Sequence, residues 1–282
     1  MALTVNTNVT SLAVQKNLNR ASDALSTSMS RLSSGLKVQN ARDNVGVLST
    51  IASINSQVRG QTVAIQNAND GMSLAQTAEG ALQESVSILQ RMRELAVQSR
   101  NDSNSAVDRT ALNKEFTAMS AELTRISAST NLNGKNLLDG SASTMTFQVG
   151  ANTGTSNQIT LTLSASFDAE TLGVGSAITI VGSDSAAAET NFSAAITAID
   201  SALQTISASR ADLGAAQNRL TTTISNLQNI NENASAALGR LQDTDFAAET
   251  AQLTKQQTLQ QASTSILSQA NQLPSAVLKL LQ

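Results

Sequence analysis

The sequence contains no histidine, cysteine, tryptophan or tyrosine, although it is 282 residues long. These absences remove the usual ligands of zinc and copper, the thiolate nucleophile, the most common general base and the rings on which nucleic-acid bases stack. A hydrolase built on two carboxylates is the enzyme class that this composition leaves open, but no pair of carboxylates stands out. We therefore expect a protein that is not an enzyme, with no cofactor and no metal.

Charged and aromatic side chains are also scarce. Charged residues make up 14% of the chain, the formal net charge is −3, and the five aromatic residues are all phenylalanine. A neutral polar surface allows identical chains to pack without accumulating like charges. The sequence has no basic cluster for nucleic acid, no apolar run long enough to span a membrane and no signal-peptide pattern at its N-terminus. We expect no nucleic-acid partner, no membrane insertion and no cleaved signal peptide.

Apolar residues repeat every seven positions near both ends of the chain, a pattern typical of helices that pair along a seam. Near the C-terminal end, one such row is accompanied by a second row at the complementary heptad offset, and a shorter row lies near the N-terminus. We expect these helices to bundle within the chain and with copies of it. The residues expected in the seams are Leu18, Leu25, Leu32, Ile206, Leu213, Leu220, Leu227 and Ile266.

Helical periodicity flanks one region of strand periodicity. The pattern predicts helices over about 5–36, 48–100, 106–130, 191–238 and from 246 onward, with Pro274 interrupting the last helix or starting a final turn. Alternating residues predict strands at 145–149 and 159–163 and a short candidate strand at 178–181, and residues 131–134 predict a turn.

These elements predict a mainly α fold with a small β region. We expect a terminal coiled coil formed by residues 1–40 and 241–282, and an α-helical rod domain with a β-hairpin formed by residues 41–150 and 191–240. Residues 151–190 are rich in serine, glycine and alanine and would form a short variable outer segment. The terminal seams should be disordered in a free monomer and fold on assembly, since their apolar side chains would find burial only between molecules.

Several long blocks of the sequence resemble bacterial flagellin, and together they cover nearly the whole chain outside about residues 155–190. The resemblance implies the flagellin fold and the function of a subunit that polymerises into the flagellar filament for swimming motility. It also implies type III export, an extracellular location and assembly at the filament tip. The blocks read NTNVTSLAVQKNLN, RLSSGLKV, NANDGMSLAQTAEGAL, LQRMRELAVQS, FQVGAN, ADLGAAQNRL and LQQASTSILSQANQLPSAVLKLL.

The partners implied by the resemblance are copies of the chain itself, a flagellar export chaperone, the filament cap, the hook-associated junction proteins and a host Toll-like receptor. By motif position, the receptor would contact Arg91, Leu95 and Glu115, although a solvated charged face explains the two charged residues equally well. The chaperone would cover apolar residues of the C-terminal tail, which otherwise form the last turn of a seam helix. These tail residues are Val277, Leu278, Leu280 and Leu281.

Two short stretches depart from the usual flagellin pattern. Residues 44–47 read Asn-Val-Gly-Val where a second aspartate and small residues are common, and Leu238-Gly239 lies where an arginine-rich stretch is usual. Both lie where the terminal and rod domains would join. Two other functions remain open: a secreted effector or adhesin whose middle segment binds a host or a surface, and a hook–filament junction protein.

Overall fold

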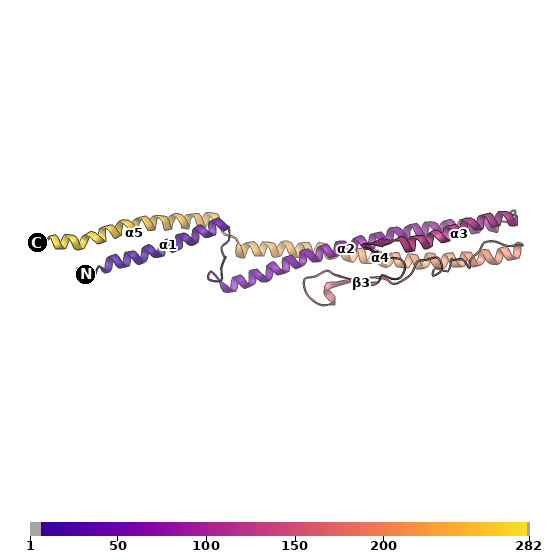
Figure 1. Cartoon of the computed structure of the whole chain (residues 1–282), viewed down its shortest axis with the longest axis horizontal. Coiled ribbons are helices and arrows are strands. Elements are labelled where there is room, and N and C mark those ends of the chain that lie inside the picture. The colour runs from indigo at the N-terminus through magenta and orange to yellow at the C-terminus, as the bar shows by residue number, and fades with distance from the viewer. Residues whose placement is uncertain (1–6, 281–282) are drawn as a thin grey trace. The chain divides into compact units, whose positions relative to one another are not determined.

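The structure is a computed structural model that describes residues 7–280, with side chains described through residue 272. The fold is mainly α-helical with a few short strands, as the sequence predicts (Figure 1). The elements are α1 (Val9–Ser34), α2 (Val45–Arg100), α3 (Ala106–Ser129), β1 (Asn131–Leu132), β2 (Lys135–Asn136), β3 (Ser143–Gln148), the 3-10 turn η1 (Thr155–Asn157), β4 (Gln158–Leu163), α4 (Ser185–Gln242) and α5 (Phe246–Leu280).

The chain forms two compact units. The terminal unit comprises Met1–Val58 with Glu232–Gln282, and the central unit comprises Arg59–Asn231. The division falls inside α2 and inside α4, where both helices continue without a break. Because the helices run through both points, helical periodicity gives no sign of them.

Capping residues fix both ends of α1 and the start of α2. Asn8 Oδ1 accepts a hydrogen bond from the Ser11 N–H at 3.0 Å at the start of α1, and Gly35, with φ 73°, ends that helix in the left-handed region that glycine adopts without strain. Asn44 Oδ1 accepts from the Val47 N–H at 3.0 Å. The asparagine that departs from the usual flagellin pattern therefore caps the start of α2.

Apolar side chains from α2, α3 and α4 form the core of the central unit, where these helices lie side by side (Figure 1). Ile206, Leu213 and Leu220 of the predicted seam are at most 1% exposed, and Leu227 is 7% exposed. This part of the seam therefore packs within the chain. Large side chains of these helices with at most 1% exposure also include Leu82, Leu89, Met92, Leu95, Phe116, Leu123 and Ile199.

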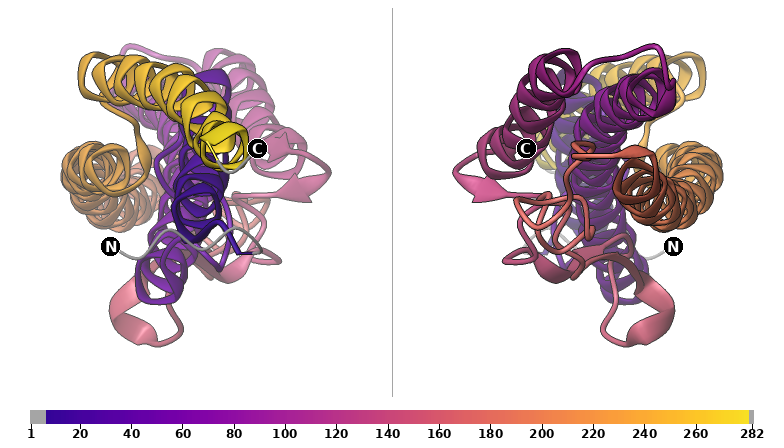
Figure 2. Two further views of the ribbon diagram at one scale, coloured as in Figure 1. Left: turned by 90° about the vertical axis from the view of Figure 1, so that its left-hand side faces the viewer. Right: turned by 90° about the vertical axis from the view of Figure 1, so that its right-hand side faces the viewer.

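Two antiparallel hairpins lie on the outside of the helices (Figure 2). The predicted strands form the β3–β4 hairpin, in which Met145 pairs with Leu161 and Phe147 with Ile159. Leu161 and Ile159 are buried, because their side of the hairpin packs on the helices. Their partners in β3, Met145 and Phe147, are only half-buried. Residues 131–136 form a second, very short hairpin, β1–β2, where the sequence predicts only a turn.

The segment that joins β4 to α4 is irregular, and it contains no strand at Ile178–Val181. The expectation of a strand there is wrong, because the segment's backbone bonds to side chains instead of to a neighbouring strand. Ser120 Oγ donates to the Val174 carbonyl at 2.9 Å, and the Ile180 N–H donates to Asn113 Oδ1 at 2.9 Å. The large apolar side chains of this segment that are buried in the core are Phe167, Leu172, Val174 and Ile180.

The last helix also differs from the prediction. α5 runs without interruption from Phe246 to Leu280 and passes through Pro274. None of the described helices combines the length and hydropathy that a membrane span requires.

Candidate subunit-interaction surfaces

Helices α1 and α5 pair antiparallel in the terminal unit (Figure 1). Near the chain ends, Asn8 Nδ2 donates to the Ala270 carbonyl at 2.8 Å, and Ser11 Oγ donates to Asn271 Oδ1 at 2.9 Å. At the opposite end of the pair, Arg31 Nη1 lies 3.9 Å from Glu249 Oε2. Polar contacts therefore join α1 and α5 at both ends of the pair.

The face of α5 that meets α1 is unusually polar for a helix pair. Its members follow steps of three and four residues, and all are buried or half-buried: Glu249, Leu253, Gln256, Gln260, Ser263, Leu267 and Ala270. On α1 the buried residues are the small Ser11, Ala21 and Ser28. Small side chains let the helices approach closely, but they bury little apolar surface. The pair therefore has a thin core.

Large apolar residues lie outside this pairing face. On α5, Leu259 is 45% exposed and Ile266 is 49% exposed, seven residues apart and therefore on one side of the helix. On α1, Leu12 and Met29 are each 57% exposed. We call the α5 pair Leu259 and Ile266 the outer apolar row.

The predicted N-terminal seam residues Leu18, Leu25 and Leu32 are half-buried within the single chain. Each lies seven residues from the next, in register with the buried Ser11, so they belong to the α1 face that meets α5. Ile266 differs, because its neighbour Leu267 occupies the pairing face in its place. Ile266 therefore stays exposed in the single chain.

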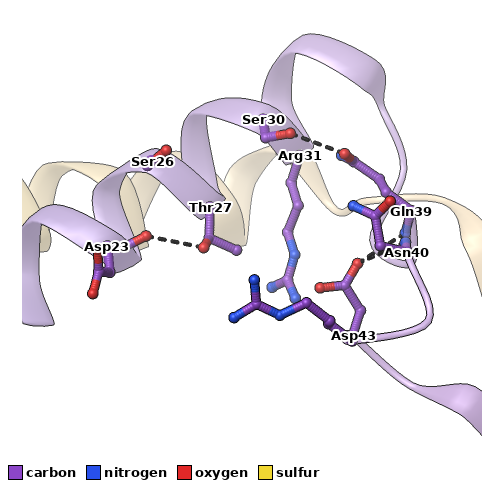
Figure 3. Close-up of a pocket in the computed structure, with 9 residues that line it drawn as sticks. Asp23, Ser26, Thr27, Ser30, Arg31, Gln39, Asn40 and Asp43 are labelled. Atoms are coloured by element: carbon purple, nitrogen blue, oxygen red, sulfur yellow. Dashed lines mark hydrogen bonds between the residues drawn. The ribbon is translucent and has the colours of Figure 1, made fainter.

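A polar pocket of about 550 Å³ lies between the end of α1 and the loop that follows it (Figure 3). The Asp43 carboxylate accepts the backbone N–H groups of Gln39 and Asn40, each at 3.0 Å. These bonds, helped by the positive charges of Arg31 and Arg42, lower the pKa of Asp43. The hydrogen bonds of Asp43 therefore hold the loop after α1 in one conformation.

Backbone hydrogen bonds also connect that loop to the segment between α4 and α5. The Lys37 N–H donates to the Gln242 carbonyl at 2.7 Å, and the Thr244 N–H donates to the Gly35 carbonyl at 2.9 Å. A Cβ at Gly239, the second departure from the flagellin pattern, would lie 3.0 Å from Asp243 Oδ2. A larger residue at 239 would therefore press on the turn that starts α5.

The predicted receptor-contact residues divide into a surface pair and a core residue. Arg91 Nη2 donates to Glu115 Oε1 at 2.7 Å and Nη1 donates to Glu94 Oε2 at 2.9 Å, and the bond to Glu115 is the main cause that raises the pKa of Arg91. The side chains of Arg91 and Glu115 are 48% and 42% exposed. Leu95 is fully buried in the helical core, so it is not available to a partner while the helices stay packed.

The predicted chaperone-binding tail is only partly covered by the structure. Val277, Leu278 and Leu280 belong to α5, but the structure does not describe their side chains. Leu281 lies outside the described residues.

Sequence reasoning missed a buried polar group at the junction of α2, α3 and α4. Arg109 of α3 is 5% exposed, and its Nε donates to the Ser99 carbonyl at 3.1 Å. Its Nη1 lies 3.5 Å from the carbonyl oxygens of Gly182 and Asp184, which precede α4. One signal was present in the sequence: Arg109 lies seven residues before Phe116, on the same stripe of α3 as that core residue.

The fold and the paired terminal helices define a helical structural subunit. Models of the bacterial flagellin N-terminal helical region and C-terminal helical region match residues 5–143 and 196–281. Flagellin D of Vibrio anguillarum is 37% identical over 381 aligned residues, and polar flagellin B/D of Vibrio parahaemolyticus is 36% identical over 377, each match covering 100% of both chains.

A solved structure, that of a putative flagellar hook-associated protein from Vibrio parahaemolyticus, resembles the chain with a TM-score of 0.60. The match covers 71% of this chain and 100% of that one at 13% identity, so the likeness shows a shared fold. The chain belongs to the bacterial flagellin family and is a subunit of the flagellar filament. This is a family of structural proteins and not of enzymes.

Proposed function

We propose that the chain is exported through the flagellar type III route without a cleaved signal peptide and polymerises outside the cell through the outer faces of α1 and α5. The observation that carries this proposal is the outer apolar row. Leu259 and Ile266 are about half exposed although the neighbouring pairing face of the same helix carries Gln256, Gln260 and Ser263 among its residues. An apolar row on the outside of a polar pair is the arrangement expected of a helix that also packs against other chains.

The energetics favour burial between subunits. Full burial of one leucine or isoleucine side chain contributes about 1.5–3 kcal/mol, so a few such residues per contact outweigh the polar contacts that hold α1 to α5. Within one chain the buried residues of α1 are small, and its leucines Leu18, Leu25 and Leu32 are only half-buried. The terminal helices therefore gain most of their stability on assembly. They are exported before polymerisation stabilises them.

Polymerisation of a matched pair of variants tests the proposal. We expect Leu259→Gln combined with Ile266→Gln to remain monomeric under conditions in which the unmodified chain grows filaments, as measured by light scattering and electron microscopy. The control changes the exposed Thr258 and Ser265 to glutamine, one position away on the same helix, and should polymerise normally. Normal filaments from the Leu259/Ile266 variant would contradict the proposal.

Polymer growth also separates this function from its alternatives. An adhesin or effector would stay monomeric and would need a free binding surface in the middle segment, yet four large apolar side chains of residues 164–182 face the chain's own core. A junction protein would form a short ring or remain monomeric instead of growing a long polymer. The cap and the hook-associated junction proteins are then partners at the two ends of the filament.

Two further partners are proposed for separate surfaces. The tail containing Val277, Leu278, Leu280 and Leu281 would bind the export chaperone before secretion, a function that a tail-deleted chain should lose in a pull-down experiment. The exposed Arg91–Glu115 ion pair supports recognition by the flagellin-sensing Toll-like receptor, without Leu95. Arg91→Ala should weaken receptor binding, whereas Arg125→Ala, which breaks another exposed ion pair, should not.

A further inference from the structure

The two-residue loop of the β1–β2 hairpin consists of Asn133 and Gly134. Both residues have positive φ, 51° and 76°, which is the geometry of a type I′ turn and explains why this dipeptide is found there. Both residues are exposed. Among the described residues, no hydrogen bond engages the Asn133 side chain, and no heavy atom lies within 4 Å of the point where a Cβ would stand on Gly134.

We propose that Asn133 is a site of spontaneous deamidation in the folded protein. The backbone nitrogen of Gly134, after losing its proton to hydroxide, attacks the side-chain amide carbon of Asn133. The new N–C bond closes a five-membered succinimide ring, and the side-chain nitrogen leaves as ammonia. Water then opens the ring at one of its two carbonyl carbons, so the product is either aspartate or isoaspartate, and the net reaction consumes one water and releases one ammonia.

The chemistry favours this position because glycine adds no side chain to hinder the attack. Residues 133–134 are the only Asn-Gly pair in the sequence. Two Asp-Gly pairs could form the same ring by losing water, but their surroundings oppose it. Asp139 accepts hydrogen bonds from Asn136 Nδ2 and from both the N–H and the hydroxyl of Ser141. The other pair, Asp70-Gly71, is held within the long helix α2.

Little structure resists the backbone rotation that ring closure needs. The hairpin has two residue pairs, Asn131 with Asn136 and Leu132 with Lys135. A ladder this short opens at low cost, since little apolar surface and few backbone bonds are lost when its tip frays. The tip can therefore visit reactive conformations while the helical core stays intact.

The reaction changes the charge of one groove. Asn133 lines a groove together with Asp70, Lys135 and half-buried apolar residues of β3. Deamidation adds one negative charge there, and the isoaspartate product also lengthens the backbone of the turn by one atom. If the chain is assembled as proposed above, subunits that have aged longer would carry this charge more often than newly made ones.

The test uses the full-length purified chain as a monomer, so its outcome does not depend on polymerisation. The chain is incubated at neutral and at alkaline pH, then analysed by isoelectric focusing, peptide mass mapping and isoaspartyl methyltransferase labelling. We expect an acidic shift of one charge per chain, faster at alkaline pH, with the mass change at residue 133. Asn131 and Asn136 in the same hairpin are internal controls and should remain intact.

Asn133→Gln removes the reactive geometry, because its longer side chain would have to close a six-membered ring, and this variant should lose the acidic shift. An equal shift in the variant and the unmodified chain would overturn the proposal. So would modification that appears first at another asparagine, or modification at residue 133 only after the chain has been denatured.

Discussion

At the scale of single residues, Arg109 shows how the central unit holds backbone that has no partner strand. Its guanidinium faces the carbonyl oxygens of Ser99, Gly182 and Asp184, and Nη2 lies 3.6 Å from Asp102 Oδ1. Arg109 therefore gives the Ser99 carbonyl at the end of α2 and the Gly182 carbonyl before α4 a donor, whereas the Asp184 carbonyl also accepts the Ala188 N–H at 3.0 Å. Arginine suits this position because its planar group carries five donors in a fixed geometry.

We expect Arg109→Met to lower the free energy of unfolding of the central unit by about 2–4 kcal/mol, since the Ser99 and Gly182 carbonyl groups both lose the donor that Arg109 provides. The measurement is urea denaturation followed by circular dichroism. Arg125→Met is the control, because Arg125 pairs with Glu122 on an exposed part of the same helix, where such pairs contribute about 0–1 kcal/mol. Equal losses in the two variants would contradict the role assigned to Arg109.

Asp139 gives the residue-scale prediction for pH. Hydrogen bonds from Ser141 and Asn136 lower the pKa of Asp139, so the folded state favours the charged carboxylate. The stability that this contributes is fully present above about pH 4, the unfolded value, and is lost as the pH falls through the lower folded pKa. Asp139→Asn should therefore be less stable than the unmodified chain at neutral pH, and the difference should shrink in thermal melts recorded at increasingly acidic pH.

At the scale of elements, the irregular segment between β4 and α4 behaves as part of the core. We expect Ile180→Asp to unfold the central unit or to lower its melting temperature strongly, because Ile180 is 2% exposed and the new charge would have no partner. Thr179→Asp, at the adjacent exposed position, should leave the melting temperature nearly unchanged. Equal tolerance of both variants, measured by thermal circular dichroism, would show that the segment is loosely held.

The sequence predicted the helices because periodicity over many residues reports directly on a buried face. The α4 row is an example: Ile206, Leu213 and Leu220 repeat every seven residues and are all buried. The irregular segment could not be predicted in this way, since its backbone is held by Ser120 and Asn113, polar residues distant in the sequence. Motif resemblance carries no information about burial, so it does not indicate that Leu95 lies in the core.

The terminal pair shows a related limit of heptad reasoning. Ile266 was assigned to a seam from its apolar character, whereas the α5 face that meets α1 carries Gln256, Gln260 and Ser263. When a helix must contact its own chain on one side and other chains on another, two faces compete for the apolar residues. A single sequence does not tell which face belongs to which partner.

At the scale of the whole molecule, the two units should differ in resistance to protease. The central unit contains the fully buried leucine, isoleucine and phenylalanine side chains, whereas the buried residues of α1 are small. In limited proteolysis of the monomer, we expect both terminal regions to be removed first and a fragment close to Arg59–Asn231 to persist, as identified by mass spectrometry. In filaments the same terminal sites should be protected. Monomer ends that resist digestion as long as the core would contradict this difference.

The turn between β3 and β4 offers a place to attach foreign sequence. Asn152, Thr153 and Gly154 are all exposed there, and Gly154 has a φ of 118°, a conformation that glycine adopts without strain. A peptide tag spliced between Thr153 and Gly154 would interrupt no helix and displace no core side chain. Each subunit could then display one copy of the tag, and the polymer would become a regular scaffold for antigens or enzymes.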